Sequence, residues 1–273
     1  FSSNGQNTIL WSVQDSLAGK QSFLLGTYHQ MGNSFIDSIP QIKFALLSSQ
    51  LAIFETIDAN NYISNRMNNR ENNYEYKAIL RKSDLTYLDS ISSNWNVPIS
   101  KVFPIELLLK LKQTYAVKLC GTVKPTDSWD HFDQYLISIA QEDSIPLYGL
   151  ETDSLQIEQI NNLTKSTMTW NDAKKPIHKI LTDIRKKRHR ERYCQSAEDY
   201  MNMQLNYQFT DSCGDKQLKS RDNKWIVQLE QILPEKKCFI AVGLFHLYGE
   251  CGLIVRLRQM GYKVETIELK IHK

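Results

Sequence analysis

Four short runs of apolar residues mark the chain, and each leads to a side chain that can bind a metal or carry a proton. Runs that are apolar at every position are typical of strands buried on both faces of a parallel or mixed sheet. The runs and the residues that follow them are 23–26 with His29, 51–54 with Glu55, 145–150 with Glu151 and 239–243 with His246. Because ligands bind beyond the carboxyl ends of such strands, the pattern predicts that the four side chains share one cleft.

Between these runs the apolar residues recur at helical spacing. Residues 44–47 predict a short helix between the first two strands, and Pro104 predicts a helix start because proline is tolerated in the first turn. Residues 132–139 and 225–233 carry apolar side chains three and four positions apart, which indicates helices with one buried face. The pattern as a whole predicts an α/β fold, with a mixed central sheet flanked by helices.

The length of 273 residues and the mass of 31.7 kDa fit one large domain or two small ones. We expect a single α/β domain over residues 1–273, with a mostly helical middle region at about 60–140 and 160–220 that covers the cleft. Apolar residues make up 41% and charged residues 23%, which excludes a fibrous or largely disordered chain. No run approaches the about 20 apolar residues that a transmembrane helix requires, so no membrane span is expected.

The balance of charged residues does not point to a particular class of binding partner. Lys and Arg number 33 and Asp and Glu 30, and the resulting net charge of +3 is too small to indicate a nucleic-acid binder. Residues 60–75 are rich in Asn and Arg and predict an exposed excursion. Residues 183–192 form a dense basic run, which we interpret as a solvated helix face rather than as a site for an anionic partner.

The cysteines and the start of the chain bear on its location. The five cysteines contain no CxxC pair, which excludes the common zinc-ribbon and thioredoxin patterns. Cys194 and Cys213 bracket a polar stretch and could form a disulfide, but this pair is not the favoured interpretation, and the pairing of the cysteines stays open. The chain opens with Phe1 and a polar run, as expected of a trimmed chain or of a mature protein whose signal peptide is gone. A secreted or periplasmic location is therefore the expectation.

The first and the last apolar runs are followed by the same motif. Residues 24–32 and 241–249 both read apolar-apolar-Gly-x-aromatic-His-x-x-Gly; Gly26 and Gly243 are the first glycines, and Tyr28 is the aromatic residue of the first copy. With 11 glycines and 6 histidines in the chain, even one Gly-x-x-His is not expected by chance. Glycine allows a sharp turn as the chain leaves the strand, so a histidine three residues later can point over the edge of the sheet.

His29 and His246, facing each other and joined by Glu55, would form a two-His-one-carboxylate set with open coordination positions. Such a set can hold a divalent metal that lowers the pKa of a bound water and polarises a carbonyl. The alternative is that each histidine is a hydrogen-bonded residue at a strand end, but the doubled motif favours the metal site. Cys251 could bind a soft metal, although a small buried residue is the preferred interpretation. His131, at a helix start, is expected to face solvent.

Together with several further blocks, these residues resemble the TraB/GumN family, which includes the Tiki-type Wnt-cleaving proteases. The blocks keep the family's order over roughly residues 8 to 268, nearly the whole chain. They are Gly26-Thr27-Tyr28-His29, Phe54-Glu55, Phe132-Asp133-x-Tyr135-Leu136, Gly149-Leu150-Glu151-Thr152 with Gln156, Arg221-x-Asn223-x-Trp225, Val242-Gly243-x-x-His246-Leu247-x-Gly249-Glu250-x-Gly252-Leu253 and Gly261-Tyr262-x-Val264.

The resemblance implies a metal-dependent hydrolase of the erythromycin-esterase/ChaN-like α/β group, with a peptidase as the favoured kind. Carried over position by position, the family's proposed metal residues fall on His29, Glu55 and His246. Further positions of the family motifs, or of the cleft around them, fall on Glu151, Arg221, Glu250, Asp133, Gly26, Tyr28 and Gly243. Phe245 stands where the family often has glycine, which would narrow the approach to the cleft.

The expected cofactor is a divalent metal (Mn, Co or Zn), and the expected partner is a peptide or protein substrate. Glu151 or Glu250 would carry the proton, and Arg221 would stabilise the developing oxyanion, unless it only forms a structural salt bridge to a glutamate. A protein that binds a porphyrin or a peptide in the same cleft without catalysis is the rival interpretation, as the resemblance to ChaN-like proteins suggests. A degenerate interaction module is the third interpretation, and the oligomeric state is open, with a homodimer among the options.

Overall fold

The computed structural model describes residues 7–15, 19–57, 62–151, 168–211 and 216–271. The chain divides into two compact units by its internal contacts. Unit 1 comprises Phe1–Ile57, Val123–Leu150 and Ser196–Lys273, and unit 2 comprises Asp58–Thr122 and Glu151–Gln195. We expected a single domain, in which the two units would fold together; this stays a prediction.

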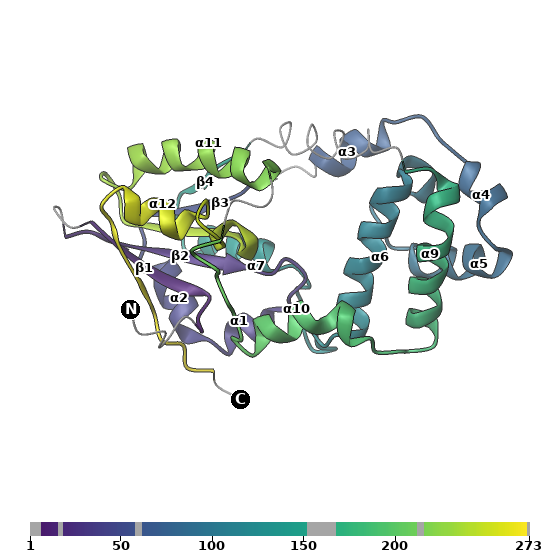
Figure 1. Cartoon of the computed structure of the whole chain (residues 1–273), viewed down its shortest axis with the longest axis horizontal. Helices are drawn as coiled ribbons and strands as arrows, with labels where there is room; N and C mark the ends of the chain where they lie inside the picture. The colour runs from purple at the N-terminus through teal and green to yellow at the C-terminus, as the bar shows by residue number, and fades with distance from the viewer. Residues whose placement is uncertain (1–6, 16–18, 58–61, 152–167, 212–215, 272–273) are drawn as a thin grey trace. The chain divides into compact units, whose positions relative to one another are not determined.

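Unit 1 is built on a six-stranded mixed sheet with the strand order β4-β3-β5-β2-β1-β6 (Figure 1). The strands are β1 (Leu10–Gln14), β2 (Gln21–Thr27), β3 (Leu51–Phe54), β4 (Leu147–Gly149), β5 (Cys238–Gly243) and β6 (Lys263–Thr266). Strands β4, β3, β5 and β2 run parallel, whereas β1 is antiparallel to both of its neighbours, β2 and β6. The predicted mixed α/β sheet is confirmed.

The four parallel strands correspond to the four apolar runs, so their carboxyl ends lie at one edge of the sheet. Strands β2 and β5 pair directly, as predicted for the two Gly-x-x-His segments, although they come from opposite ends of the chain. Gly26 lies opposite Val242 and Thr27 lies opposite Gly243, so the two motifs are offset by one residue across the ladder. The sheet therefore brings both histidine loops to the same edge.

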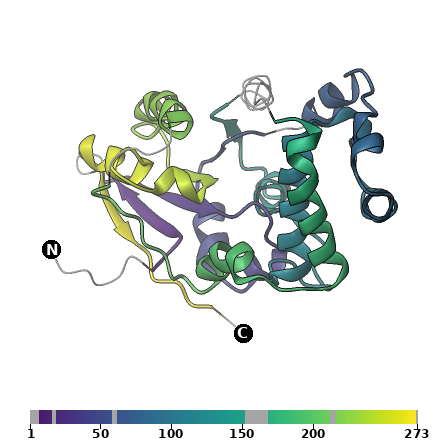
Figure 2. The same ribbon diagram turned by 45° about the vertical axis from the view of Figure 1, so that its right-hand side comes forward.

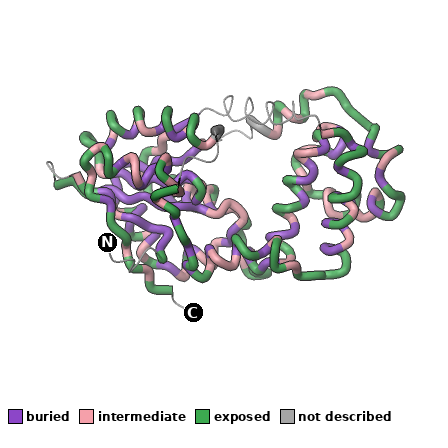
Figure 3. Tube along the Cα trace, in the orientation of Figure 1, coloured by how far each residue is buried: buried purple, intermediate pink, exposed green. Residues whose placement is uncertain are grey.

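Helices cover both faces of this sheet, as views from two directions show (Figures 1 and 2). One layer contains α1 (Asn33–Asp37), α2 (Pro40–Leu47) and α7 (Phe132–Glu142), and the other contains α11 (Lys216–Ile232) and α12 (Leu253–Gln259). The central strands are buried almost throughout (Figure 3), which explains why they are apolar at consecutive positions. Leu136 on α7 and Trp225 on α11 are fully buried, as their helical spacing predicted.

Unit 2 is helical, which confirms the helical middle region for the part of it that is described. Its helices are α3 (Tyr62–Asn68), α4 (Glu75–Ile79), α5 (Lys82–Ile91), the short η1 (Ile99–Lys101), α6 (Pro104–Leu119), α9 (Trp170–Arg185) and the start of α10 (Glu191–Met201). Helix α6 begins at Pro104 as predicted, and the Glu106 carboxylate caps it by accepting the Phe103 N–H at 2.8 Å. Among the described helices, none is both long and apolar enough to cross a membrane.

The structure pairs Cys194 with a different cysteine from the one that the sequence analysis considered. Cys120, at the end of α6, forms a disulfide with Cys194 on α10 across 74 residues of sequence. Cys194 is therefore not available to Cys213, which lies outside the described residues. Cys251 is also disulfide-bonded and offers no thiolate to a metal, whereas Cys238 is a buried free thiol. Helix packing brings the first pair together, and no local spacing signals it.

The basic run at residues 183–192 is not one helix face. Helix α9 ends at Arg185, Lys187 adopts a left-handed conformation with φ of 50°, and α10 begins at Glu191. A left-handed residue cannot continue a right-handed helix, so the run forms a turn between two helices. Residues 186–189 are exposed, as expected, but Asp183 is buried and bonds to Arg190 at 3.0 Å.

Candidate functional site

A cleft of about 620 Å³ opens in unit 1 at the carboxyl edge of the parallel strands. Its walls come from the loops after β2 and β5, the end of β3, the segment 196–208 and helix α11. His29, Glu55 and His246 line the cleft together with Arg221. The cleft thus contains three of the four strand-end residues that the sequence predicted to meet.

The three proposed metal ligands converge around Gly243. A Cβ atom at this position would lie 2.9 Å from Oε1 of Glu55, 3.6 Å from Nε2 of His29 and 3.8 Å from Cδ2 of His246. Any side chain here would therefore press on the carboxylate and enter the space between the two imidazoles. Glycine is required because the ligands surround the backbone closely.

Gly26 has a different reason to be glycine. A Cβ atom here would lie 2.7 Å and 2.8 Å from side-chain methyl groups of Leu244 and Leu247. These leucines belong to η2 (Leu244–Leu247), the short helix that carries His246. Gly26 thus lets η2 pack against β2, and its contribution to the cleft is through packing.

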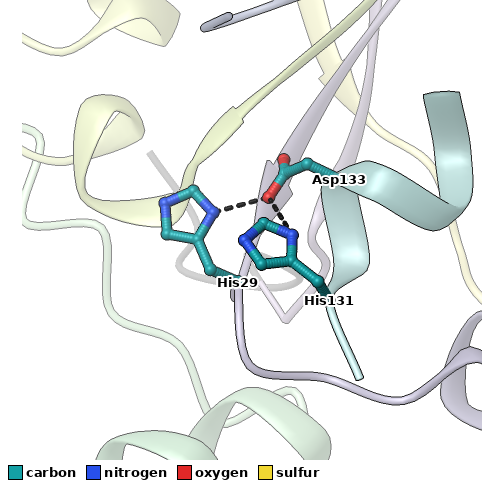
Figure 4. A group of neighbouring side chains, drawn as sticks. All are labelled: His29, His131 and Asp133. Carbon is teal, nitrogen blue, oxygen red and sulfur yellow. Dashed lines mark hydrogen bonds and ion pairs between the residues drawn. The ribbon is translucent and has the colours of Figure 1, made fainter. Parts of the chain in front are cut away.

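His29 is supported by Asp133 from α7, as Figure 4 shows. Its Nδ1 lies 2.5 Å from Oδ2 of Asp133, and the Thr27 hydroxyl donates to Oδ1 of the same carboxylate at 2.9 Å. Burial lowers the pKa of His29, but the charge and hydrogen bond of Asp133 together with the charge of Glu55 outweigh burial and raise the pKa to about 9. Burial raises the pKa of Asp133, but the charge and hydrogen bond of His29, with His131 and the Thr27 hydroxyl, together outweigh burial and bring the pKa below its ordinary value.

His131 lies closer to this pair than the sequence indicated. Although 36% of its side chain is exposed, its Nδ1 is 3.9 Å from Oδ2 of Asp133 and its ring centroid is 5.6 Å from that of His29 (Figure 4). The three residues offer ligand atoms within 4.8 Å of one another and could in principle hold a cation. However, His29 and Asp133 already bond directly through Nδ1, so we assign Asp133 to the support of the His29 ring.

His246 has the same kind of support from a residue that the sequence analysis missed. Its Nδ1 lies 2.6 Å from Oδ1 of Asp222 on α11, and both side chains are at most 4% exposed. Its ring centroid lies 4.2 Å from that of Trp225, one turn farther along the same helix. Burial raises the pKa of Asp222. The sequence did contain a signal for Asp222: it follows Arg221 directly and lies one turn before Trp225, on a helix whose buried face the apolar spacing already indicated.

Glu55 is held in place from two sides. Its Oε1 accepts the Gly243 N–H at 2.6 Å, and its Oε2 accepts from Nη2 of Arg221, also at 2.6 Å. Nη1 of Arg221 donates to Nε2 of His246 at 3.0 Å, which places the His246 proton on Nδ1, toward Asp222. Burial raises the pKa of Glu55, but the electrostatic attraction of the His246, Arg221 and His29 side chains and the Gly243 N–H together outweigh it, so the pKa lies below its ordinary value.

The arrangement satisfies the main chemical requirement of a metal site. Each imidazole has its Nδ1 tied to an aspartate, which fixes the ring orientation and makes Nε2 the nitrogen that would bind a metal, although in this structure Nε2 of His246 accepts the Arg221 N–H. Two such nitrogens and one ionised carboxylate are suitable ligands for Zn²⁺, Mn²⁺ or Co²⁺. The residues that are present therefore fit the metal that the sequence implied.

The other predicted site residues stand apart from this centre. Glu151 follows β4 and is buried, and Glu250 is exposed; neither is among the described residues that line the cleft. Their roles in proton transfer stay predictions. Thr152 and Gln156 of the family-like blocks lie outside the described residues.

Aromatic side chains form part of the cleft wall. Tyr28 lines the cleft and packs against Tyr200 at a centroid distance of 5.6 Å. Phe245 is 63% exposed and stands 5.8 Å from Tyr248, which also lines the cleft. The residue that replaces the family's frequent glycine therefore adds an aromatic ring to the cleft wall.

Comparison with known proteins shows which family the chain belongs to. No match was found among curated proteins. The family model described as TraB/PrgY/gumN matches residues 9–266, a range that contains every residue of the cleft. The chain therefore belongs to the TraB/PrgY/gumN family.

Proposed function

We propose that this protein is a metal-dependent hydrolase that cleaves peptide bonds. One observation carries the proposal: two imidazoles from opposite ends of the chain, each anchored at Nδ1 by an aspartate, converge on Glu55 in a cleft. Such anchoring is a recurrent property of metal-ligating histidines. Family membership supports the proposal but does not by itself supply an activity.

His29, Glu55 and His246 would hold the metal. When bound there, Mn²⁺, Co²⁺ or Zn²⁺ supplies a Lewis acid that polarises a carbonyl and lowers the pKa of water. Asp133 and Asp222 fix the two rings and make their Nε2 atoms better electron donors. The support residues thus determine the geometry of the site before any metal enters it.

The chain's own polar groups would complete the reaction. Arg221 carries a fixed positive charge in the cleft and would stabilise negative charge that develops on a carbonyl oxygen. Glu151 and Glu250 remain the candidates for proton transfer. Separate substitutions of each by glutamine, with the pH dependence of cleavage as the readout, distinguish the two.

A peptide is the substrate class that suits the cleft best. Leu205, Phe245 and Tyr248 offer apolar contact on its wall, while Gln204 and Asn206 offer amides that can bond to a peptide backbone. We also propose a secreted or periplasmic location. The disulfide between Cys120 and Cys194, and that of Cys251, are typical of proteins that fold outside the reducing cytosol.

The test begins with protein purified without chelator and analysed for bound metals. Peptide-library cleavage is then measured before EDTA, after EDTA, and after addition of Mn²⁺, Co²⁺ or Zn²⁺. We expect EDTA to abolish cleavage, one metal to restore it, and His29→Ala and His246→Ala to remain inactive. His189→Ala, at an exposed position outside the cleft, should keep full activity.

Two results would contradict the proposal. Full activity in either cleft-histidine variant excludes the assigned ligands. Stoichiometric retention of a ligand without any product, together with a Soret band when haem is added, favours the binding protein that the sequence left as the rival interpretation.

A further inference from the structure

The guanidinium of Arg221 lies between two of the proposed metal ligands. Its Nη2 is 2.6 Å from Oε2 of Glu55, and its Nη1 is 3.0 Å from Nε2 of His246. His246 Nε2 also lies 3.7 Å from Oε1 of Glu55, the other oxygen of the same carboxylate. One cationic side chain thus binds two atoms that a metal ion would also need.

This arrangement is held firmly. The Arg221 side chain is 17% exposed and that of Glu55 is 11% exposed, so solvent screens their attraction only weakly. Hydrogen bonds between charged groups are shorter and stronger than neutral ones. The guanidinium also lies over the ring of Trp225, 4.6 Å from its centroid, which adds a cation–π contact.

The two cations cannot use these atoms together. The Nε2 of His246 has a single lone pair, and that lone pair accepts the Arg221 N–H. A divalent ion at the same place would also face a fixed positive charge at close range. We infer that Arg221 is an internal competitor that occupies Glu55 and His246, and that a metal binds this pair only by displacing its two N–H groups.

The inference rests on the proposed metal site and adds a function for its arginine. The Gly243 N–H bonds to the other oxygen of Glu55, so that contact need not break when Arg221 leaves. A displaced guanidinium would have two N–H donors available in the cleft, where a carbonyl oxygen of the substrate can accept them. Without metal, Arg221 would occupy the metal-binding atoms of Glu55 and His246. Once a metal has displaced it, Arg221 would donate hydrogen bonds to the developing oxyanion, the role that the sequence suggested.

The experiment compares metal binding by the full chain in calorimetric titrations with Zn²⁺ and Co²⁺. The variants are Arg221→Met, which keeps an apolar stem beside Trp225, and Arg221→Lys, which keeps the charge but loses the two-pronged donor geometry. Arg258→Met is the matched control, because Arg258 also lies over a tryptophan, Trp11, but outside the cleft. Melting temperature with and without metal is a second readout.

We expect Arg221→Met to bind metal at least about tenfold more tightly than the wild type, since a binding-competent pair is then always present. Its metal-free form should melt at a lower temperature, because Glu55 loses its counter-ion, and metal should raise that temperature more than in the wild type. Arg221→Lys should fall between the two, and it replaces Arg221→Met if that variant does not fold. Arg258→Met should match the wild type in metal affinity.

The outcomes separate the two claims. If the wild type binds metal and the Arg221 variants bind it with equal or lower affinity, the inference is overturned, but the proposed hydrolase is not contradicted. Tighter binding by Arg221→Met, without peptide cleavage by any variant, supports the inference and contradicts the hydrolase. No metal binding by any variant overturns both.

Discussion

At the scale of single residues, the candidate centre is organised by pairs of imidazole and carboxylate. Asp133 holds His29 and Asp222 holds His246, each through the Nδ1 atom. Neither aspartate needs to touch a metal to matter, because each fixes the tautomer and the direction of the ring that would bind the proposed metal.

Replacing either support should weaken the site without removing a ligand. We expect Asp133→Asn and Asp222→Asn each to lower metal affinity by about 10- to 100-fold, because the amide no longer accepts the Nδ1 proton as a carboxylate does. Equilibrium dialysis with Zn²⁺ measures the effect. Asp199→Asn, which changes a carboxylate elsewhere in the cleft, is the control. Unchanged affinity in both support variants would exclude the role assigned to the aspartates.

The raised pKa of His29 makes a prediction for the metal-free protein. Its value of about 9 lies above the ordinary 6.5, so the His29–Asp133 ion pair stabilises the fold fully below about pH 6.5. That contribution is lost as the pH rises through about 9. Urea unfolding in EDTA at pH 6 and at pH 9.5 should show that His29→Gln costs stability at the lower pH and much less at the higher. An equal cost at both values contradicts the shift.

At the scale of elements, two strands, each with a glycine at or next to its last residue, position the histidines. Strands β2 and β5 pair in parallel, so the loops that follow them emerge side by side. The two glycines have different roles, however, because Gly243 lies against the Glu55 carboxylate, whereas Gly26 lies against leucine side chains of η2.

Alanine at each glycine should separate these roles. Gly243→Ala displaces the Glu55 carboxylate and should reduce metal affinity more than fold stability. Gly26→Ala crowds Leu244 and Leu247 and should lower the free energy of unfolding by about 1–3 kcal/mol. Calorimetric metal titration and urea unfolding of both variants give the comparison. If Gly243→Ala bound metal as tightly as the wild type, the close packing of ligands around this glycine would be irrelevant to the site.

The sequence was most informative at this scale. Apolar runs and helical spacing are local patterns, so they predicted the parallel strands, α6 from Pro104 and α11 around Trp225. Asp222 was missed because its partner, His246, is distant in sequence and no local motif records the pair. The position of His131 was missed for the same reason: His131 precedes α7, whereas the His29 ring that it approaches follows β2, far away in sequence.

At the scale of the whole molecule, the fold combines a sheet unit that contains the cleft and a helical unit with its own disulfide. The sequence predicted the class of the fold and the helical middle region. It did not predict the Cys120–Cys194 bond, because two helices must pack before these residues can meet.

The disulfide should contribute substantially to the stability of unit 2. It closes a loop of 74 residues, for which the loss of chain entropy in the unfolded state corresponds to about 4 kcal/mol. The double variant Cys120→Ser/Cys194→Ser should therefore unfold at a clearly lower urea concentration. Cys238→Ser, at a buried free thiol, controls for the substitution itself. A double variant as stable as this control would contradict a stabilising role.

The central claim is that His29, Glu55 and His246 share one metal ion. The most direct test is an anomalous-scattering map from crystals of the protein grown with Zn²⁺ or Co²⁺. Our account predicts a single strong peak in contact with Nε2 of both histidines and with the Glu55 carboxylate. A peak between His29, His131 and Asp133 instead, or no peak in the cleft, would contradict it.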